Sequence, residues 1–132
     1  MKEAPPKRVL VMDDDPAIRR VLRTVLEGEG YEVAEAEGGI QGLRLLRERA
    51  FDLVVADLFM PDGDGLEFLT RLKPREAGVP VLVISGGSAH LKSGGLDLAR
   101  LLGASRTLAK PFRPSEVVAA ARALLGAPPA PP

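Results

Sequence analysis

The sequence predicts a single α/β domain with a doubly wound, five-stranded parallel sheet. Apolar runs and amphipathic runs alternate five times along the chain, which is typical of consecutive βα units. Several apolar runs are continuous, as expected of parallel strands that helices cover on both faces. The chain has 132 residues, of which 45% are hydrophobic, enough for one compact domain with a core.

Each element follows from a local pattern. Strands are expected where the sequence is apolar, at residues 8–12, 31–36, 53–56, 81–84 and 106–109. Helices are expected where apolar side chains recur at helical spacing, around residues 18–26, 40–46, 66–72, 98–102 and 117–124. Pro16 suits the first turn of the first helix, and Gly28 lies near its end. Ser115 is expected to cap the last helix, with Pro114 ending the turn before it.

These elements give a domain at residues 7–125, preceded by an N-terminal extension at residues 1–6. The last residues, 126–132, form a proline-rich tail with the sequence GAPPAPP. Such a tail cannot be helical, and we interpret it as a stiff, extended end or as the stub of a linker.

Composition excludes several kinds of site and partner. The chain has no cysteine, so it has no disulfide, thiolate zinc site or thiol nucleophile. No apolar run approaches the roughly 20 residues that span a bilayer, so we expect a cytoplasmic protein without a membrane partner. The formal net charge is zero, which argues against direct binding of nucleic acid. Arginines such as Arg19, Arg20 and Arg23 are interpreted as part of a solvated helix face.

Polar residues follow four of the predicted strands. They are Asp13, Asp14 and Asp15 after the first strand, Asp57 after the third, Ser85 after the fourth and Lys110 after the fifth. Ligands of doubly wound sheets bind outside the carboxyl ends of the strands. If the strand order is the common 2-1-3-4-5, the first and third strands are neighbours and their acids meet. Because clustered carboxylates raise one another's pKa, a cation is expected among them.

The chemistry of this set favours phosphoryl transfer. Oxygen ligands without His or Cys favour Mg²⁺ with retained waters. A carboxylate beside Mg²⁺ can attack phosphorus and form an aspartyl phosphate, while the metal and Lys110 offset charge on the phosphoryl group. Ser85 could hydrogen-bond a phosphoryl oxygen. Each residue alone is more simply a turn, cap or surface residue, but their joint placement at four strand ends favours a functional site.

Four segments resemble the response-regulator receiver domains of two-component signalling. They are VLVMDDDPAIRRVL, DLVVADLFMPDGDGLEFL, VPVLVIS and GASRTLAKPF, which together cover nearly the whole expected fold. The resemblance implies a flavodoxin-like (βα)5 fold with strand order 2-1-3-4-5, similar to the chemotaxis regulator. It also implies that the chain is a phosphoprotein of phosphorelay signal transduction.

The same resemblance implies specific roles at the acidic cluster. Asp57 would be the phosphoacceptor. Asp13 and Asp14 would form the acid pair, with Asp14 the more direct Mg²⁺ ligand, and Phe59 would supply a backbone carbonyl to the metal. Asp15 lies outside the pair, and we interpret it as a solvated carboxylate at the helix start.

Further roles are implied at the fourth and fifth strands. Ser85 stands at the hydroxyl position and Lys110 at the position that pairs with phosphate, and both are assigned to the catalytic set with Asp57. The Lys110–Pro111 peptide bond is expected to be cis. Thr107 stands where many receivers carry an aromatic residue, which is a departure from the family pattern.

The resemblance also implies the partners. A sensor histidine kinase or a histidine phosphotransfer protein would donate the phosphoryl group, and an unknown downstream protein would read the phosphorylated state. The chain would catalyse only its own phosphorylation and dephosphorylation, and so would not be an enzyme with a separate substrate. We expect it to act alone or in a phosphorelay.

Two alternatives remain open at this stage. The chain could be a receiver-like adaptor that is not phosphorylated, as Thr107 mildly suggests. Alternatively, Asp13 and Asp15 resemble the nucleophile motif of haloacid dehalogenase-type phosphatases. That second reading leaves Asp57 without a role.

Overall fold

The structure, a computed structural model, describes residues 5–57, 68, 71, 78–85 and 105–126. Five parallel strands form one sheet in the order β2-β1-β3-β4-β5, which confirms the predicted fold class and strand order. The strands are β1 (Arg8–Met12), β2 (Glu32–Ala36), β3 (Leu53–Asp57), β4 (Val81–Ser85) and β5 (Arg106–Ala109). The described helices are α1 (Pro16–Gly28), α2 (Gly39–Glu48) and α5 (Pro114–Leu125). No helix in these described ranges is long and apolar enough to cross a membrane.

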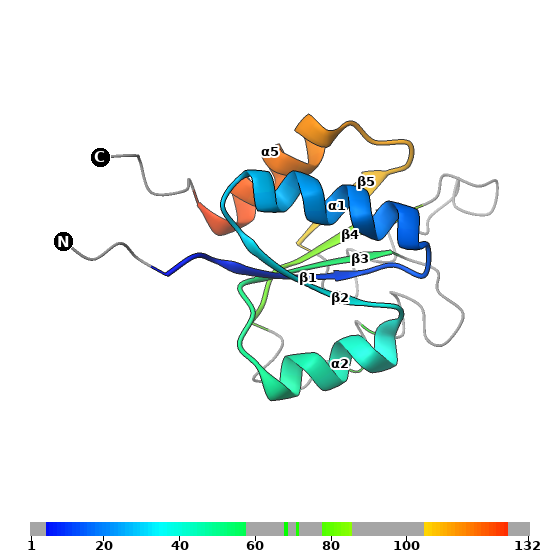
Figure 1. Cartoon of the computed structure of the whole chain (residues 1–132), viewed down its shortest axis with the longest axis vertical. Helices are drawn as coiled ribbons and strands as arrows, with labels where there is room; N and C mark the ends of the chain where they lie inside the picture. Colours follow the sequence, from blue (N-terminus) through cyan, green and yellow to red (C-terminus); the bar gives the residue numbers. More distant parts are fainter. Residues whose placement is uncertain (1–4, 58–67, 69–70, 72–77, 86–104, 127–132) are drawn as a thin grey trace.

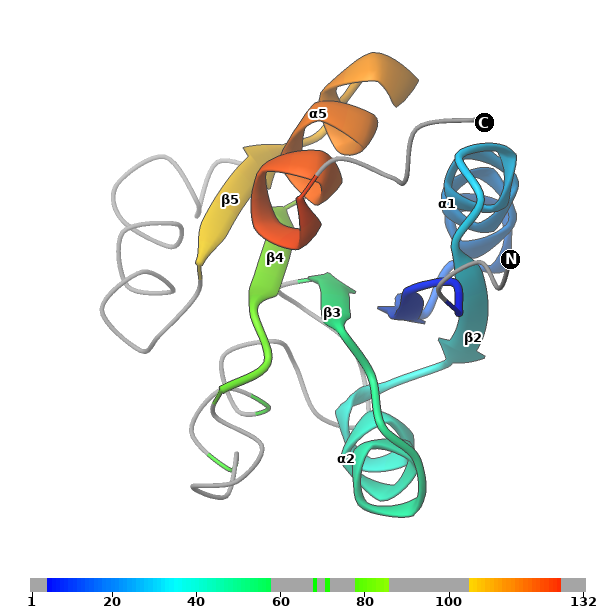
Figure 2. The same ribbon diagram turned by 90° about the vertical axis from the view of Figure 1, so that its left-hand side faces the viewer.

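Helices cover both faces of the sheet. Figure 1 shows α1 and α5 above the strands and α2 below them, and Figure 2 shows the same division from the side. Side chains of β1 alternate between the two cores, because successive residues of a strand point to opposite faces. Leu10 and Met12 pack on the α2 side, whereas Val9 and Val11 pack under α1 and α5. Helices on both faces explain why the strands read as continuous apolar runs.

Two expected helices lie largely outside the described residues. These are the helices around residues 66–72 and 98–102, and only Phe68 and Arg71 of the first are described. Phe68 is 1% exposed and belongs to the core on the α2 side. The chain ends, at residues 1–4 and 127–132, also lie outside the description.

The second strand begins one residue later than predicted. The Tyr31 N–H donates to the Leu26 carbonyl of α1 at 3.2 Å, whereas the strand pairing begins with Glu32 opposite Arg8. The chain leaves α1 through Gly30, whose φ of 92° is rarely adopted by residues with a side chain. Tyr31 therefore belongs to the turn that ends α1, although it is buried like a strand residue.

The prediction that Ser115 caps the last helix is wrong. α5 begins at Pro114, so Ser115 lies inside its first turn and Arg113 is the N-cap. Pro114 starts the helix instead of ending the turn before it, because the first helical position needs no N–H donor. Glu116 reaches back to accept a hydrogen bond from the Arg113 N–H at 2.8 Å, which partly replaces the missing Ser cap.

Gly42 allows α2 to lie close to β1. A Cβ added at this position would overlap the Sδ of Met12, whose side chain is fully buried. Ala favours a helix by about 1 kcal/mol over Gly, but overpacking a core costs about 1–3 kcal/mol. We expect Gly42→Ala to lower the free energy of unfolding by about 1 kcal/mol in urea denaturation.

Gly28→Ala is the matched control for this substitution. A Cβ at Gly28, the last residue of α1, meets nothing within 4 Å. Its stability should stay equal to that of the parent protein or rise slightly. A Gly42→Ala protein as stable as the Gly28→Ala protein would show that the core yields at Met12 without cost.

Candidate functional site

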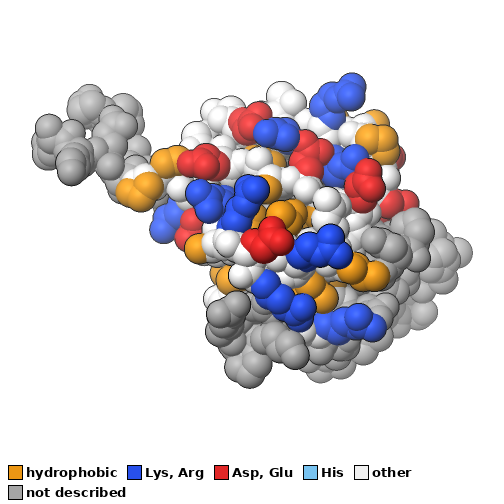
Figure 3. All heavy atoms as spheres, turned by 60° about the horizontal axis from the view of Figure 1, so that its bottom comes forward, with side chains coloured by type: hydrophobic (Ala, Val, Ile, Leu, Met, Phe, Trp, Pro, Cys, Tyr) orange, Lys and Arg blue, Asp and Glu red, His pale blue; other side chains and the backbone are white. Residues whose placement is uncertain are grey.

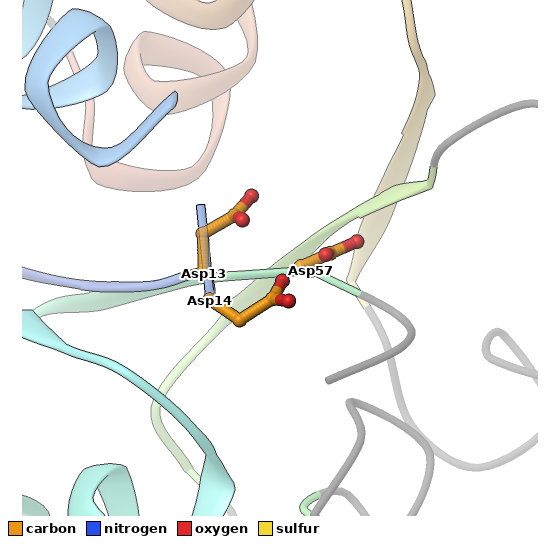
Figure 4. A group of neighbouring side chains, drawn as sticks. All are labelled: Asp13, Asp14 and Asp57. Carbon is orange, nitrogen blue, oxygen red and sulfur yellow. The ribbon is translucent and has the colours of Figure 1, made fainter. Parts of the chain in front are cut away.

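Three carboxylates meet at the carboxyl ends of β1 and β3. Asp13 and Asp14 follow β1, Asp57 ends β3, and the pairing of Met12 with Ala56 places the two strand ends side by side. One carboxylate oxygen from each residue lies within 4.8 Å of the other two. Figure 4 shows the three side chains projecting beyond the strand ends on the same side. The strand-end rule therefore brings together three of the four acids that the sequence singled out.

Asp13 is the most deeply buried of the three acids, with 1% of the residue exposed. One carboxylate oxygen accepts the Asp15 N–H at 2.9 Å, and the other accepts the Lys110 ammonium at 3.1 Å. Burial raises the pKa of Asp13 above its ordinary value, and the Asp15 N–H and Lys110 only partly oppose this rise. Without a further cation, the folded protein therefore favours the protonated form of Asp13 more than a free aspartate would.

Lys110 reaches the acids from a strand end two positions away in the sheet. It follows β5, which is separated from β3 by β4. Neighbouring strands lie about 4.8 Å apart, so only a long side chain can cross β4. The Lys110 Nζ lies 3.7 Å from Asp57 Oδ2 as well as close to Asp13. The Lys110–Pro111 peptide bond is cis, as predicted.

The donor set fits a hard divalent cation. Among the described residues, three carboxylates face one ammonium, that of Lys110, which leaves negative charge in excess when all three are ionised. Asp13 and Asp57 are buried, whereas Asp14 is exposed. A cation held between them is therefore open to water on the Asp14 side. Carboxylate ligands on one side and water on the other are the usual surroundings of Mg²⁺.

The remaining predicted site residues are only partly described. Ser85 is the last residue of β4, and its backbone pairs with Ala109, so it lies at the same edge of the sheet. The Ser85 side chain is not among the described groups, and Phe59 lies wholly outside the described residues. Thr107 lies in β5, opposite Val83 of β4.

Asp15 caps α1 rather than joining the acidic cluster. Its Oδ1 accepts the Ala17 N–H at 2.9 Å, and the residue is exposed. This placement agrees with the interpretation of Asp15 as a carboxylate at the helix start.

The sequence interpretation missed Arg19. This arginine was assigned to a solvated face, but only 13% of its side chain is exposed. Its Nη1 donates to the Asp13 carbonyl at 2.7 Å, and its Nε donates to Glu35 of β2 at 3.0 Å. Only the pairing of β1 with β2, in which Glu35 lies opposite Val11, could have indicated this contact.

Comparisons with known proteins agree on one family. The family model described as the response regulator receiver domain matches residues 9–122. Over 118 residues the chain is 45% identical to the KDP operon transcriptional regulatory protein KdpE of Escherichia coli (strain K12), covering 89% of this chain and 50% of that protein. It is 40% identical over 121 residues to the response regulator MprA of Mycobacterium sp. (strain KMS), covering 91% and 51%.

Solved structures show the same likeness. A CheY-like response regulator receiver domain protein from Methanospirillum hungatei JF-1 superposes with a TM-score of 0.81 at 29% identity, covering 91% of this chain and 94% of that one. The chain spans about half the length of the curated relatives it matches, but nearly all of this receiver structure.

Proposed function

Because this chain belongs to the response regulator receiver domain family, we propose that it accepts a phosphoryl group on Asp57 in a Mg²⁺-dependent reaction. The observation that carries the proposal is the convergence of Asp13, Asp14 and Lys110 on the Asp57 carboxylate. An isolated aspartate at a strand end is usually a cap or a turn residue. Here a second and a third acid and a lysine that crosses a neighbouring strand surround it.

The reaction assigns a task to each residue. A carboxylate oxygen of Asp57 forms a bond to phosphorus while the P–N bond of a phosphohistidine donor breaks, and the electron pair stays on the donor imidazole. Lys110, 3.7 Å from Asp57 Oδ2, hydrogen-bonds an oxygen of the transferred group. Asp13 and Asp14 would hold the metal, with Asp57 and, as the family resemblance implies, the Phe59 carbonyl as further ligands. Mg²⁺, when bound, supplies positive charge against the phosphoryl oxygens. The Ser85 hydroxyl hydrogen-bonds the phosphoryl group after transfer.

We propose that a sensor histidine kinase or a histidine phosphotransfer protein is the donor. The chain then catalyses only its own phosphorylation and dephosphorylation, acts in the cytoplasm, and works alone or within a phosphorelay. The phosphatase alternative is less well supported, because its second aspartate, Asp15, caps α1 instead of facing the cluster.

The proposed output is contact with a protein rather than with nucleic acid. KdpE is named as a transcriptional regulatory protein, but this chain aligns with half of it. The exposed arginines on and just after α2 are Arg44, Arg47 and Arg49. In the view of Figure 3, the side of the molecule that carries α2 is turned toward the reader. Lys and Arg side chains lie among Asp and Glu side chains there. Mixed charge of this kind supports a protein partner, because nucleic acid is bound by surfaces of one sign.

The test is the intact mass of the protein after incubation with acetyl phosphate. With Mg²⁺ we expect a gain of one phosphoryl group that hydroxylamine removes, as it does for acyl phosphates. With EDTA in place of Mg²⁺, the gain should disappear. If no gain occurs with acetyl phosphate or with phosphorylated histidine kinases, the unphosphorylated adaptor becomes the better explanation.

A further inference from the structure

We propose that Arg19 is a positioning residue for the metal site. It fixes the peptide unit between Asp13 and Asp14, and so aims the Asp14 carboxylate at the cation. This inference rests on the proposed function, because it assigns a role toward the Mg²⁺ that the acidic cluster would hold. Within the described part of the chain, the Arg19 guanidinium donates to the Asp13 carbonyl and to Glu35, and not to the carboxylate of a proposed metal ligand.

The contacts of Arg19 join three elements at one point. Arg19 lies in the first turn of α1, where its N–H donates to the Asp15 carbonyl at 3.0 Å. Its guanidinium donates through Nη1 to the Asp13 carbonyl and through Nε to Glu35 of β2. The rigid, planar fork of an arginine fixes both acceptors at once, which a single-point ammonium does less well. The loop between β1 and α1 is thereby tied to the neighbouring strand.

Asp14 needs this support more than Asp13 does. The Asp13 carboxylate is held directly, by the Asp15 N–H and by Lys110. The Asp14 side chain is exposed, and it accepts no hydrogen bond from the residues that the structure describes. Its direction therefore depends on the backbone, and the Asp13 carbonyl is part of the peptide unit that precedes it. Some groups do not bind the metal themselves but hold its ligands in the right orientation. Removing such a group typically lowers metal affinity by about 10–100-fold.

Glu35 offsets the positive charge of the Arg19 guanidinium close to the proposed metal site. An unpaired guanidinium near the cluster would repel a metal ion, but the Glu35 carboxylate faces Arg19 at 3.0 Å and Arg23 at 2.7 Å. Arg23 in turn pairs with Glu27. The hydrogen bonds that Glu35 accepts from Arg23 and Arg19 lower the pKa of Glu35 below its ordinary value. Glu35 is therefore ionised at neutral pH, and it offsets the positive charge while leaving the Nη1 contact to Asp13 intact.

The experiment compares Arg19→Met with Arg23→Met in the whole chain. Both substitutions remove an arginine partner of Glu35, but only Arg19 also donates to the Asp13 carbonyl. Two quantities are measured: the Mg²⁺ dissociation constant by calorimetry, and the metal-free exchange rate of the Asp15 amide by NMR. For Arg19→Met we expect the dissociation constant to rise about tenfold. We expect the Asp15 amide to exchange several times faster, and Arg23→Met to change each quantity less than twofold.

The outcomes separate this inference from the proposed function. If the parent protein binds no Mg²⁺, the metal part of the proposed function fails, and the exchange rate of the Asp15 amide still decides whether Arg19 holds the loop. If Arg19→Met leaves both quantities unchanged, or if Arg23→Met changes them equally, the positioning role is wrong. Arg19→Lys replaces Arg19→Met if the latter unfolds, and it should weaken Mg²⁺ binding because it loses the fork while keeping the charge.

Discussion

Asp57→Asn is expected to abolish the phosphoryl gain completely, both with acetyl phosphate and with a phosphorylated kinase. A carboxamide has no anionic oxygen to attack phosphorus, and it is a weaker ligand for Mg²⁺. The substitution also removes one of three clustered carboxylates, so it should not lower the stability of the metal-free protein. Intact mass gives the first readout and thermal unfolding the second. Together they separate loss of the acceptor from loss of the fold.

Asp52→Asn is the matched control. Asp52 immediately precedes β3, so it lies at the opposite end of the strand that Asp57 ends. It is exposed, and its carboxylate accepts the Arg8 N–H at 2.8 Å. This variant should gain one phosphoryl group at the parent rate. A phosphoryl gain in Asp57→Asn would mean that another residue is the acceptor.

The fold was predictable because its strongest signals are local. Continuous apolar runs mark strands that are covered on both faces, and α1 and α2 carry their buried residues at helical spacing. The errors occurred at element ends, where competing local interactions decide. At α5, a proline that needs no donor and a glutamate that reaches back moved the start one residue ahead of Ser115. The order of the strands came from known doubly wound folds rather than from any pattern in this chain.

The acidic cluster was predictable because parallel strands place their carboxyl ends at one edge of the sheet. Asp13, Asp14 and Asp57 therefore met once the strand order was right. Arg19 was not predictable in this way. Its contacts depend on a side-chain conformation that bridges α1 and β2, and helical spacing carries no information about it. A charged residue on a helix is usually solvated. Arg19 is an exception, because its guanidinium contacts the backbone of the acidic cluster.

Lys110→Met is expected to slow phosphorylation of Asp57 by about 10²–10³-fold, the usual cost of removing one group that stabilises developing negative charge. The methionine fills a similar volume but leaves the phosphoryl oxygens without the ammonium. Initial rates of mass gain with acetyl phosphate and saturating Mg²⁺ provide the measurement. Lys7→Met is the matched control, because Lys7 is exposed just before β1 and far from the carboxyl ends of the strands. Its rate should equal that of the parent protein.

Lys110→Met should also have a pH-dependent effect on the stability of the protein without Mg²⁺. Burial raises the pKa of Asp13 above its ordinary value of 3.8, so the folded state binds the proton more tightly than the unfolded state does. The stability that Asp13 contributes is therefore fully present below the ordinary pKa of the carboxyl group. It is lost as the pH rises through the pKa of Asp13 in the folded protein. Removing Lys110 takes away a contact that lowers this pKa, which raises it further and enlarges the loss.

We therefore expect Lys110→Met to lower the free energy of unfolding by about 1–3 kcal/mol at pH 7, the cost of leaving a buried acceptor unpaired. The loss should be smaller near pH 4, because a larger share of Asp13 is then protonated in the folded protein and leaves less negative charge for the ammonium to offset. Urea denaturation at both pH values, with Lys7→Met beside it, measures the difference. An equal loss at both pH values would mean that Lys110 stabilises the fold through the packing of its side chain. The charge of its ammonium group would then not be needed to stabilise the buried Asp13 carboxylate.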